Sequence, residues 1–122
     1  GVYMSDLKLY DAEFKFMNIV WEFEPVNSKE LSIICGERLG WKRPTTYTVI
    51  RKLAERGFVK NENATVSALV KREKIQKYEA DTLLEKDFAG SVPSFIATFL
   101  QGKSLTEEEA HSLWKLIEGA KK

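Results

Sequence analysis

A cluster of hydroxyl, phenol and guanidinium groups between residues 45 and 52 has the spacing of one helix face. At 100° per residue, Thr48 and Arg51 lie on one side of such a helix, and Thr45, Tyr47 and Lys52 flank them. An arginine can donate two hydrogen bonds to a guanine, and a threonine can contact a thymine methyl or a phosphate. These residue types at this spacing predict contact with the major groove of double-stranded DNA.

Basic residues surround this segment. Residues 36–60 carry seven basic and two acidic side chains, a net charge of +5, whereas the whole chain carries only +1. Lys42 and Arg43 precede the predicted helix and are placed for backbone phosphates, which give affinity rather than sequence preference. The residues placed to reach an adjacent sugar-phosphate chain after the helix are Lys60, Asn61 and Asn63. A local positive patch on a nearly neutral protein indicates a docked anion.

The same helix has an apolar side, and a second helix precedes it. The residues expected to face the core are Thr46, Val49, Ile50 and Leu53. The preceding helix is predicted from Asn27 or Ser28 to about Leu39, and Gly40 closes it. Because Pro44 suits the first turn of the next helix, two short helices follow each other across a tight turn. This order predicts a helix-turn-helix.

Segments on both sides complete a winged helix. An apolar pattern predicts a first helix that is capped by Asp11 and ends near Phe23. Phe23 is expected on a second apolar face of this helix, together with Phe16 and Ile19. After Gly57, "FVKNENATVSALVK" predicts two strands around a turn at residues 62–64. We therefore predict a mainly α fold with a small β-hairpin, in which residues 1–71 form a winged-helix DNA-binding domain. A basic helix alone is more often just solvated, and the order of the elements favours DNA over that alternative.

Residues 72–122 predict three further helices. One runs from about Arg72 to Phe88, a short apolar helix follows, and a capping box at Thr106 opens the last. Three helices cannot bury so many large apolar groups alone, so we expect a second copy to share the core. The residues expected in this homodimer contact are Leu84, Phe88, Phe95, Ile96, Phe99, Leu100, Leu113, Trp114, Leu116 and Ile117. A self-contained helical cap is the alternative.

The chain offers little for catalysis, metal binding or a cofactor. It has one histidine, His111, one cysteine, Cys35, and no glycine-rich phosphate loop, so we expect no enzyme, no metal and no cofactor. A lone thiol fits a reducing, cytoplasmic setting; we expect Cys35 to be a buried apolar residue, with a redox switch as the alternative. We expect His111 to be solvated. No apolar run approaches the ~20 residues of a membrane helix, and no segment reads as a signal peptide.

Taken together, these segments resemble the penicillinase repressor family. The resemblance rests on Ala12-Glu13, "MNIVW", "W…T..T.IRKLAERGFV" and "FIATFLQGKSLTEEEAHSLWKLIE", and it covers most of residues 11–118. It implies a cytoplasmic bacterial transcriptional repressor that binds a palindromic operator as a homodimer and controls a beta-lactam-resistance or related stress operon. The family's Thr-x-x-Thr positions on the DNA-reading helix match Thr45 and Thr48, and its other exposed contacts correspond to Tyr47 and Arg51.

The resemblance also concerns how repression ends, and there the chain departs from the family. In the beta-lactam-responsive members, an upstream membrane sensor protease leads to cutting at an Asn-Phe bond, and the matching bond here is Asp87-Phe88. The copper-responsive members carry C-terminal Cys-x-Cys motifs, which this chain lacks. The inducing signal therefore stays open.

Two other functions fit parts of the same pattern. A winged helix can dock a partner protein, in which case the positive patch would meet an acidic surface and binding would not require a DNA duplex. A ligand-sensing regulator would hold a small molecule in an apolar cavity between the C-terminal helices. A metabolite that binds there would raise the thermal stability.

Overall fold

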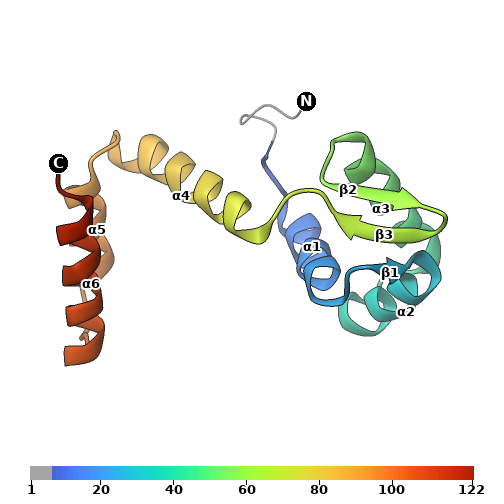
Figure 1. Cartoon of the computed structure of the whole chain (residues 1–122), viewed down its shortest axis with the longest axis horizontal. Helices are drawn as coiled ribbons and strands as arrows, with labels where there is room; N and C mark the ends of the chain where they lie inside the picture. The colour runs from blue at the N-terminus through green and yellow to red at the C-terminus, as the bar shows by residue number, and fades with distance from the viewer. Residues whose placement is uncertain (1–6) are drawn as a thin grey trace. The chain divides into compact units, whose positions relative to one another are not determined.

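A computed structural model describes residues 7–122, so the first six residues of the predicted domain 1–71 lie outside the described part. The elements in chain order (Figure 1) are α1 (Asp11–Phe23), β1 (Val26–Asn27), α2 (Ser28–Leu39), α3 (Arg43–Glu55), β2 (Val59–Glu62), β3 (Thr65–Ala68), α4 (Arg72–Phe88), α5 (Val92–Leu100) and α6 (Glu107–Ala120). The chain divides into two compact units, one up to Thr82 and the other from Leu83 to Lys122. None of the described helices is both long and apolar enough to cross a membrane.

The first unit is the predicted winged helix, with one strand more than expected. The hairpin of β2 and β3 turns between Glu62 and Thr65, as the sequence indicates. The additional strand, β1, pairs antiparallel with β3, opposite Val66 and Thr65, and gives the sheet order β1-β3-β2. Two residues are too few for an alternating pattern, so the sequence carries no signal for β1.

The helix-turn-helix has the termini that its sequence predicts. The Asn27 side chain accepts a hydrogen bond from the Lys29 backbone N–H at 2.8 Å and caps α2. Gly40 ends α2 in the left-handed conformation, at φ +71°, where a residue with a Cβ would be strained. Pro44 lies in the first turn of α3, where its missing N–H costs no helical hydrogen bond.

Two expectations for α1 are wrong. Asp11 does not cap α1 but is its first helical residue, and Tyr10 is the N-cap. The backbone N–H of Tyr10 donates to the Glu13 carboxylate at 2.9 Å, so the acid three residues into the helix satisfies this group. Phe23, expected on a second apolar face, is 37% exposed, and the Arg38 guanidinium lies 5.0 Å from its ring centroid.

Every buried side chain of the described residues lies in the first unit. The largest of them come from α1, α2, α3, α4 and the connection before β2, and they include Phe16, Met17, Leu31, Leu53, Phe58 and Ile75. Leu7 and Leu9 are buried as well, although they precede α1. Arg56 holds this leading segment in place, because it hydrogen-bonds the Lys8 carbonyl and pairs with Glu13 at 3.4 Å.

Two tryptophans, Trp21 and Trp41, pack against this core. The Trp41 ring stacks on Phe16 with centroids 5.8 Å apart. The Trp21 indole N–H donates to the Val70 carbonyl at 2.9 Å, and its ring meets Phe14 edge-on. Trp41 therefore fixes the turn before α3 from the inside, which positions the helix that carries the candidate site.

The second unit consists of the end of α4 together with α5 and α6. The Ser91 side chain caps α5, and Thr106 and Glu109 form the predicted capping box of α6 through two reciprocal hydrogen bonds of 3.0 Å. Phe95 lies between Phe88 and Phe99, with ring centroids 5.2 and 6.0 Å away. No side chain from Gln76 onwards is buried, so these helices lack a closed core within one chain.

Candidate nucleic-acid interface

The two faces of α3 follow the predicted helical period. Thr46, Ile50 and Leu53 are buried, and Val49 packs against the core from a partly buried position. The opposite side carries the predicted polar set, in which Thr45, Tyr47, Arg51 and Lys52 are exposed and Thr48 is half-buried. The hydroxyl, phenol and cationic groups thus share one side of a helix that is fixed in the core by its other side.

Not all seven basic residues of the 36–60 patch are free to meet an anion. Three of them pair with carboxylates: Arg38 with Glu22, Arg56 with Glu13 and Lys60 with Glu62. The hydrogen bond from Arg38 also holds the pKa of the Glu22 carboxyl below its usual range. The remaining four, which form no ion pair with any residue in the described part, are Lys42, Arg43, Arg51 and Lys52. The available positive charge is therefore concentrated along α3 and the turn before it.

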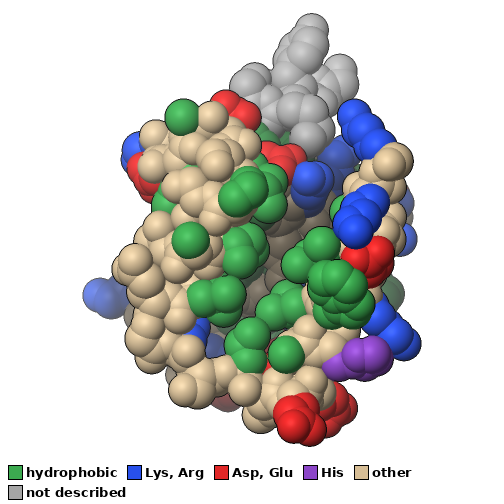
Figure 2. Space-filling view, turned by 90° about the vertical axis from the view of Figure 1, so that its left-hand side faces the viewer, with side chains coloured by type: hydrophobic (Ala, Val, Ile, Leu, Met, Phe, Trp, Pro, Cys, Tyr) green, Lys and Arg blue, Asp and Glu red, His purple; other side chains and the backbone are tan. Residues whose placement is uncertain are grey.

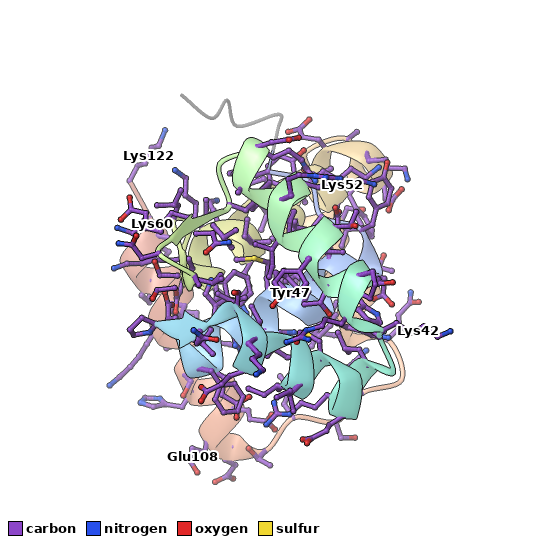
Figure 3. The ribbon with its side chains drawn as sticks, turned by 90° about the vertical axis from the view of Figure 1, so that its right-hand side faces the viewer. Lys42, Tyr47, Lys52, Lys60, Glu108 and Lys122 are labelled. Atoms are coloured by element: carbon purple, nitrogen blue, oxygen red, sulfur yellow. The ribbon has the colours of Figure 1, made fainter. Side chains whose placement is uncertain are left out.

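Figure 3 shows how these groups lie on the surface of the winged helix. Lys42 extends from one end of α3 and Lys52 from its later turns, while Tyr47 points outward between them. Lys60 projects from the wing beside the helix. A helix with outward hydroxyl and cationic groups can donate hydrogen bonds to base edges, and cations at its ends can meet phosphates.

The wing formed by β2 and β3 is held close to α2. The backbone N–H of Ser28 donates to the Ala64 carbonyl at 2.8 Å, and β3 pairs with β1 just before that helix. Asn63 and Ala64 both have positive φ, 52° and 60°, as a tight hairpin turn requires. Asn63 is exposed at the tip, as predicted, and Lys60 is exposed but lies 3.8 Å from Glu62, which lowers its value as a phosphate ligand.

The buried contact between α2 and α3 contains a thiol and a hydroxyl. Cys35 is fully buried, as predicted, and burial raises its pKa to about 11 against a smaller opposing effect of the Thr46 side chain. The Thr46 hydroxyl oxygen is itself buried and has no hydrogen-bond partner of normal geometry. Neither group reaches the surface, so this part of the helix-turn-helix serves packing.

A second surface, the apolar face of the second unit, contains the residues predicted for dimerisation. Leu84, Phe88, Phe95 and Leu100 are half-buried, and the exposed members are Ile96, Phe99, Leu113, Trp114, Leu116 and Ile117. Figure 2 shows hydrophobic side chains gathered along a hollow of this surface. A groove of about 450 Å³ lies between α5 and α6, lined by apolar Phe99, Leu105, Leu113 and Leu116 and by polar Thr106, Glu108, Glu109 and Ser112.

The polar residues of the second unit form no evident site. His111 is exposed on α6, and Glu107, Glu108 and Glu109 occupy the first turn of that helix, where they complement its dipole. Within residues 7–122, no three histidine, cysteine or carboxylate side chains are grouped so that they could hold a metal ion. Asp87 is exposed at the end of α4, and Phe88 packs on Phe95.

The first unit has three helices, a short sheet with a wing, and a polar, cationic outer face on the third helix. Together these features define a winged-helix DNA-binding protein. Comparison with known proteins identifies the family. The penicillinase repressor family model matches residues 9–119, so the chain belongs to this family of transcriptional repressors.

Two curated relatives cover nearly the whole chain. The penicillinase repressor of Bacillus licheniformis is 22% identical over 121 residues, which span 91% of this chain and 90% of that protein. The penicillinase repressor of Staphylococcus aureus is 26% identical over 110 residues, which span 87% of each. The expected family is thus confirmed across both units.

Proposed function

We propose that the chain represses transcription as a homodimer whose two winged helices bind the two halves of a palindromic operator. The proposal rests on how polar, cationic and apolar side chains are distributed between the two units. Free cations and hydroxyls are concentrated on α3 of the first unit, whereas the second unit has an apolar face and no buried side chain. Two-fold symmetry would place two copies of α3 on two equivalent half-sites.

The dimer contact is supported by the amount of apolar surface that a single chain leaves in water. Leu116 is 69% exposed and Trp114 is 56% exposed, and both lie on α6. Leu116 also lines the groove, together with Phe99. Burying such a side chain stabilises by about 1.5–3 kcal/mol. A second copy could cover this apolar face and supply the core that α5 and α6 lack.

Occupation of promoter DNA would repress transcription, and loss of the dimer would end it. One chain alone makes about half of the contacts, so its affinity for the full operator should fall steeply. Such a repressor acts in the cytoplasm, and the names of the two relatives suggest a beta-lactam-resistance or related stress operon. A neighbouring gene for a membrane sensor protease would support this assignment.

The Asp87-Phe88 bond is our candidate for inactivation by such a protease. The bond closes α4, and α5 and α6 follow it, so a cut there would separate both helices from the winged helix. All buried side chains precede Gln76 and would stay together. A chain that ends at Asp87 should therefore remain folded as a monomer and bind the operator weakly. Unchanged operator affinity of this truncated chain would refute the proposed route.

The direct test of the proposal is selection from a randomised duplex pool, followed by fluorescence-anisotropy binding across a salt series. We expect a palindrome to be enriched and the affinity to fall steeply with salt, because binding to phosphates releases counterions. Weak binding without sequence selection would instead favour a partner protein with an acidic surface.

Two substitutions distinguish base contacts from phosphate contacts in the same assay. Arg51→Ala should cost about 1–3 kcal/mol of binding energy and relax preference at one base. Lys42→Ala should weaken all sequences similarly and flatten the salt dependence. A change of base preference in the Lys42 variant would contradict this assignment.

A small ligand is a second candidate for the groove between α5 and α6, because that groove of about 450 Å³ has apolar side chains with polar ones beside them. A ligand bound there to the folded chain would raise its thermal stability. A screen of the chain against metabolites at concentrations that leave the dimer intact would detect it. Varying the protein concentration would distinguish the two events, because dimerisation depends on it and ligand binding to the folded chain does not.

A further inference from the structure

Arg43 and Tyr47 form a contact on the outer side of α3 that the helical spacing alone does not reveal. The Arg43 guanidinium carbon lies 6.0 Å from the centroid of the Tyr47 ring, one helical turn later. Arg43 has no carboxylate partner among the described residues, and Tyr47 is 37% exposed. The Tyr47 ring thus contacts a cation that forms no ion pair within residues 7–122 and is open to a ligand.

Contact with an aromatic ring changes what an arginine can do. A guanidinium that lies against a ring face keeps its planar edge, and the N–H donors on that edge remain free. The contact also restricts a long side chain that would otherwise sample many rotamers. A guanidinium pre-ordered in this way is suited to two acceptors at fixed spacing, such as O6 and N7 of guanine.

We propose that Arg43 reads a guanine in each half-site and that Tyr47 is the residue that positions it. This inference rests on the proposed function, and it revises the sequence-based assignment of Arg43 to backbone phosphates. Lys42, one residue earlier, provides the contrast. Its ammonium group lies over no aromatic ring of residues 7–122 and is a compact charge without a planar fork. Lys42 keeps the phosphate role.

The test compares the full-length wild type with variants in the same duplex selection. Arg43→Ala should lose a guanine preference at one position of each half-site, with a fall of roughly 5- to 150-fold in discrimination at that base. Arg43→Lys should lose the same preference, because lysine keeps the charge but not the fork. Lys42→Ala, the matched control, should weaken every sequence by a similar factor and leave the preferred bases unchanged.

Tyr47 variants test the positioning role. Tyr47→Ala should lose the same guanine preference as Arg43→Ala, whereas Tyr47→Phe should keep it because the ring remains. The double variant Arg43→Ala/Tyr47→Ala should show little further loss at that base, since the two side chains act as a unit. Thermal melting of every variant checks that the winged helix stays folded.

The possible outcomes distinguish a failure of this inference from a failure of the proposed function. If Arg43→Ala weakened all duplexes equally, or if Arg43→Lys kept the preference, Arg43 would be a phosphate contact and the inference would be wrong. A guanine preference that survived Tyr47→Ala but not Arg43→Ala would refute the positioning role. If the wild type selected no palindrome, the proposed function itself would fail.

Discussion

Cys35 and Thr46 are neighbouring buried groups whose chemistry is set by burial. The pKa of the Cys35 thiol is raised to about 11, so the thiol is protonated at neutral pH and is a poor nucleophile. Burial in the helix-turn-helix core therefore disfavours a redox switch, which was the alternative role for Cys35 in the sequence analysis. A thiol-specific reagent provides the check.

We expect Cys35 to react with such a reagent at pH 8 no faster than the protein opens, and to react at once in denaturant. Rapid labelling of the folded chain would contradict its burial. The raised pKa also has a defined pH dependence. An unfolded thiol ionises near 9.0 and the folded one near 11, so this group contributes stability below pH 9 that is lost as the pH rises to 11. Urea unfolding of the Cys35→Ala variant should lack this component.

The buried Thr46 hydroxyl forms no hydrogen bond of normal geometry, although it lies close enough to the Cys35 thiol to lower the pKa of that group. A buried polar group without a partner costs about 1–3 kcal/mol, and valine has nearly the same shape without the hydroxyl. Thr46→Val should therefore raise the free energy of unfolding by about 1 kcal/mol or more. Thr45→Val, one residue away on the exposed side, is the control and should leave stability nearly unchanged while weakening DNA binding. A less stable Thr46→Val variant would show that the hydroxyl is bonded.

The wing turn contains a local conflict between residue type and backbone conformation. Ala64 has φ +60°, a conformation that costs an L-residue about 1–2 kcal/mol and glycine almost nothing. Glycine also loses more backbone entropy on folding, about 0.5–1 kcal/mol. We expect Ala64→Gly to be neutral or stabilising by up to about 1 kcal/mol.

The matched control for this substitution is Ala80→Gly in the middle of α4, where Ala80 is exposed. There only the entropy loss applies, so stability should fall by about 0.5–1 kcal/mol. Chemical denaturation of both variants provides the comparison. A larger loss at position 64 than at position 80 would contradict the strained turn.

The elements also show what the sequence could and could not predict. The helix-turn-helix was predictable because Asn27, Gly40 and Pro44 are local signals at the helix ends. The outer face of α3 followed from helical period, with Thr46 inward and Arg51 outward. Local patterns of this kind need no knowledge of distant partners.

Contacts between distant residues were not predictable. Arg56 meets the Lys8 carbonyl across 48 positions and Arg38 meets Glu22 across 16, so the sequence overstated the free charge of the 36–60 patch. Strand β1 and the buried Leu7 and Leu9 were missed because segments this short have no readable period. The contact between Arg43 and Tyr47 depends on rotamers, which composition does not reveal.

At the scale of the whole molecule, the unpaired apolar face of α6 yields a direct prediction. Leu116 is 69% exposed in one chain, so a polar residue there costs the monomer little. In a dimer that covers this face, Leu116→Asp would bury an unpaired charge. We expect sedimentation velocity to show dimers for the wild type and monomers for Leu116→Asp. Lys115→Asp, at an exposed neighbouring position outside the apolar set, should remain dimeric.

A dimeric repressor is best distinguished from a monomeric one by the stoichiometry and affinity of the chain on a selected operator and on one half of that operator. Light scattering coupled to gel filtration gives the number of chains per duplex, and anisotropy gives the two affinities. We expect two chains on the full palindrome and much weaker binding to the half-site. One chain per duplex, with similar affinity for the palindrome and its half, would contradict a dimeric repressor.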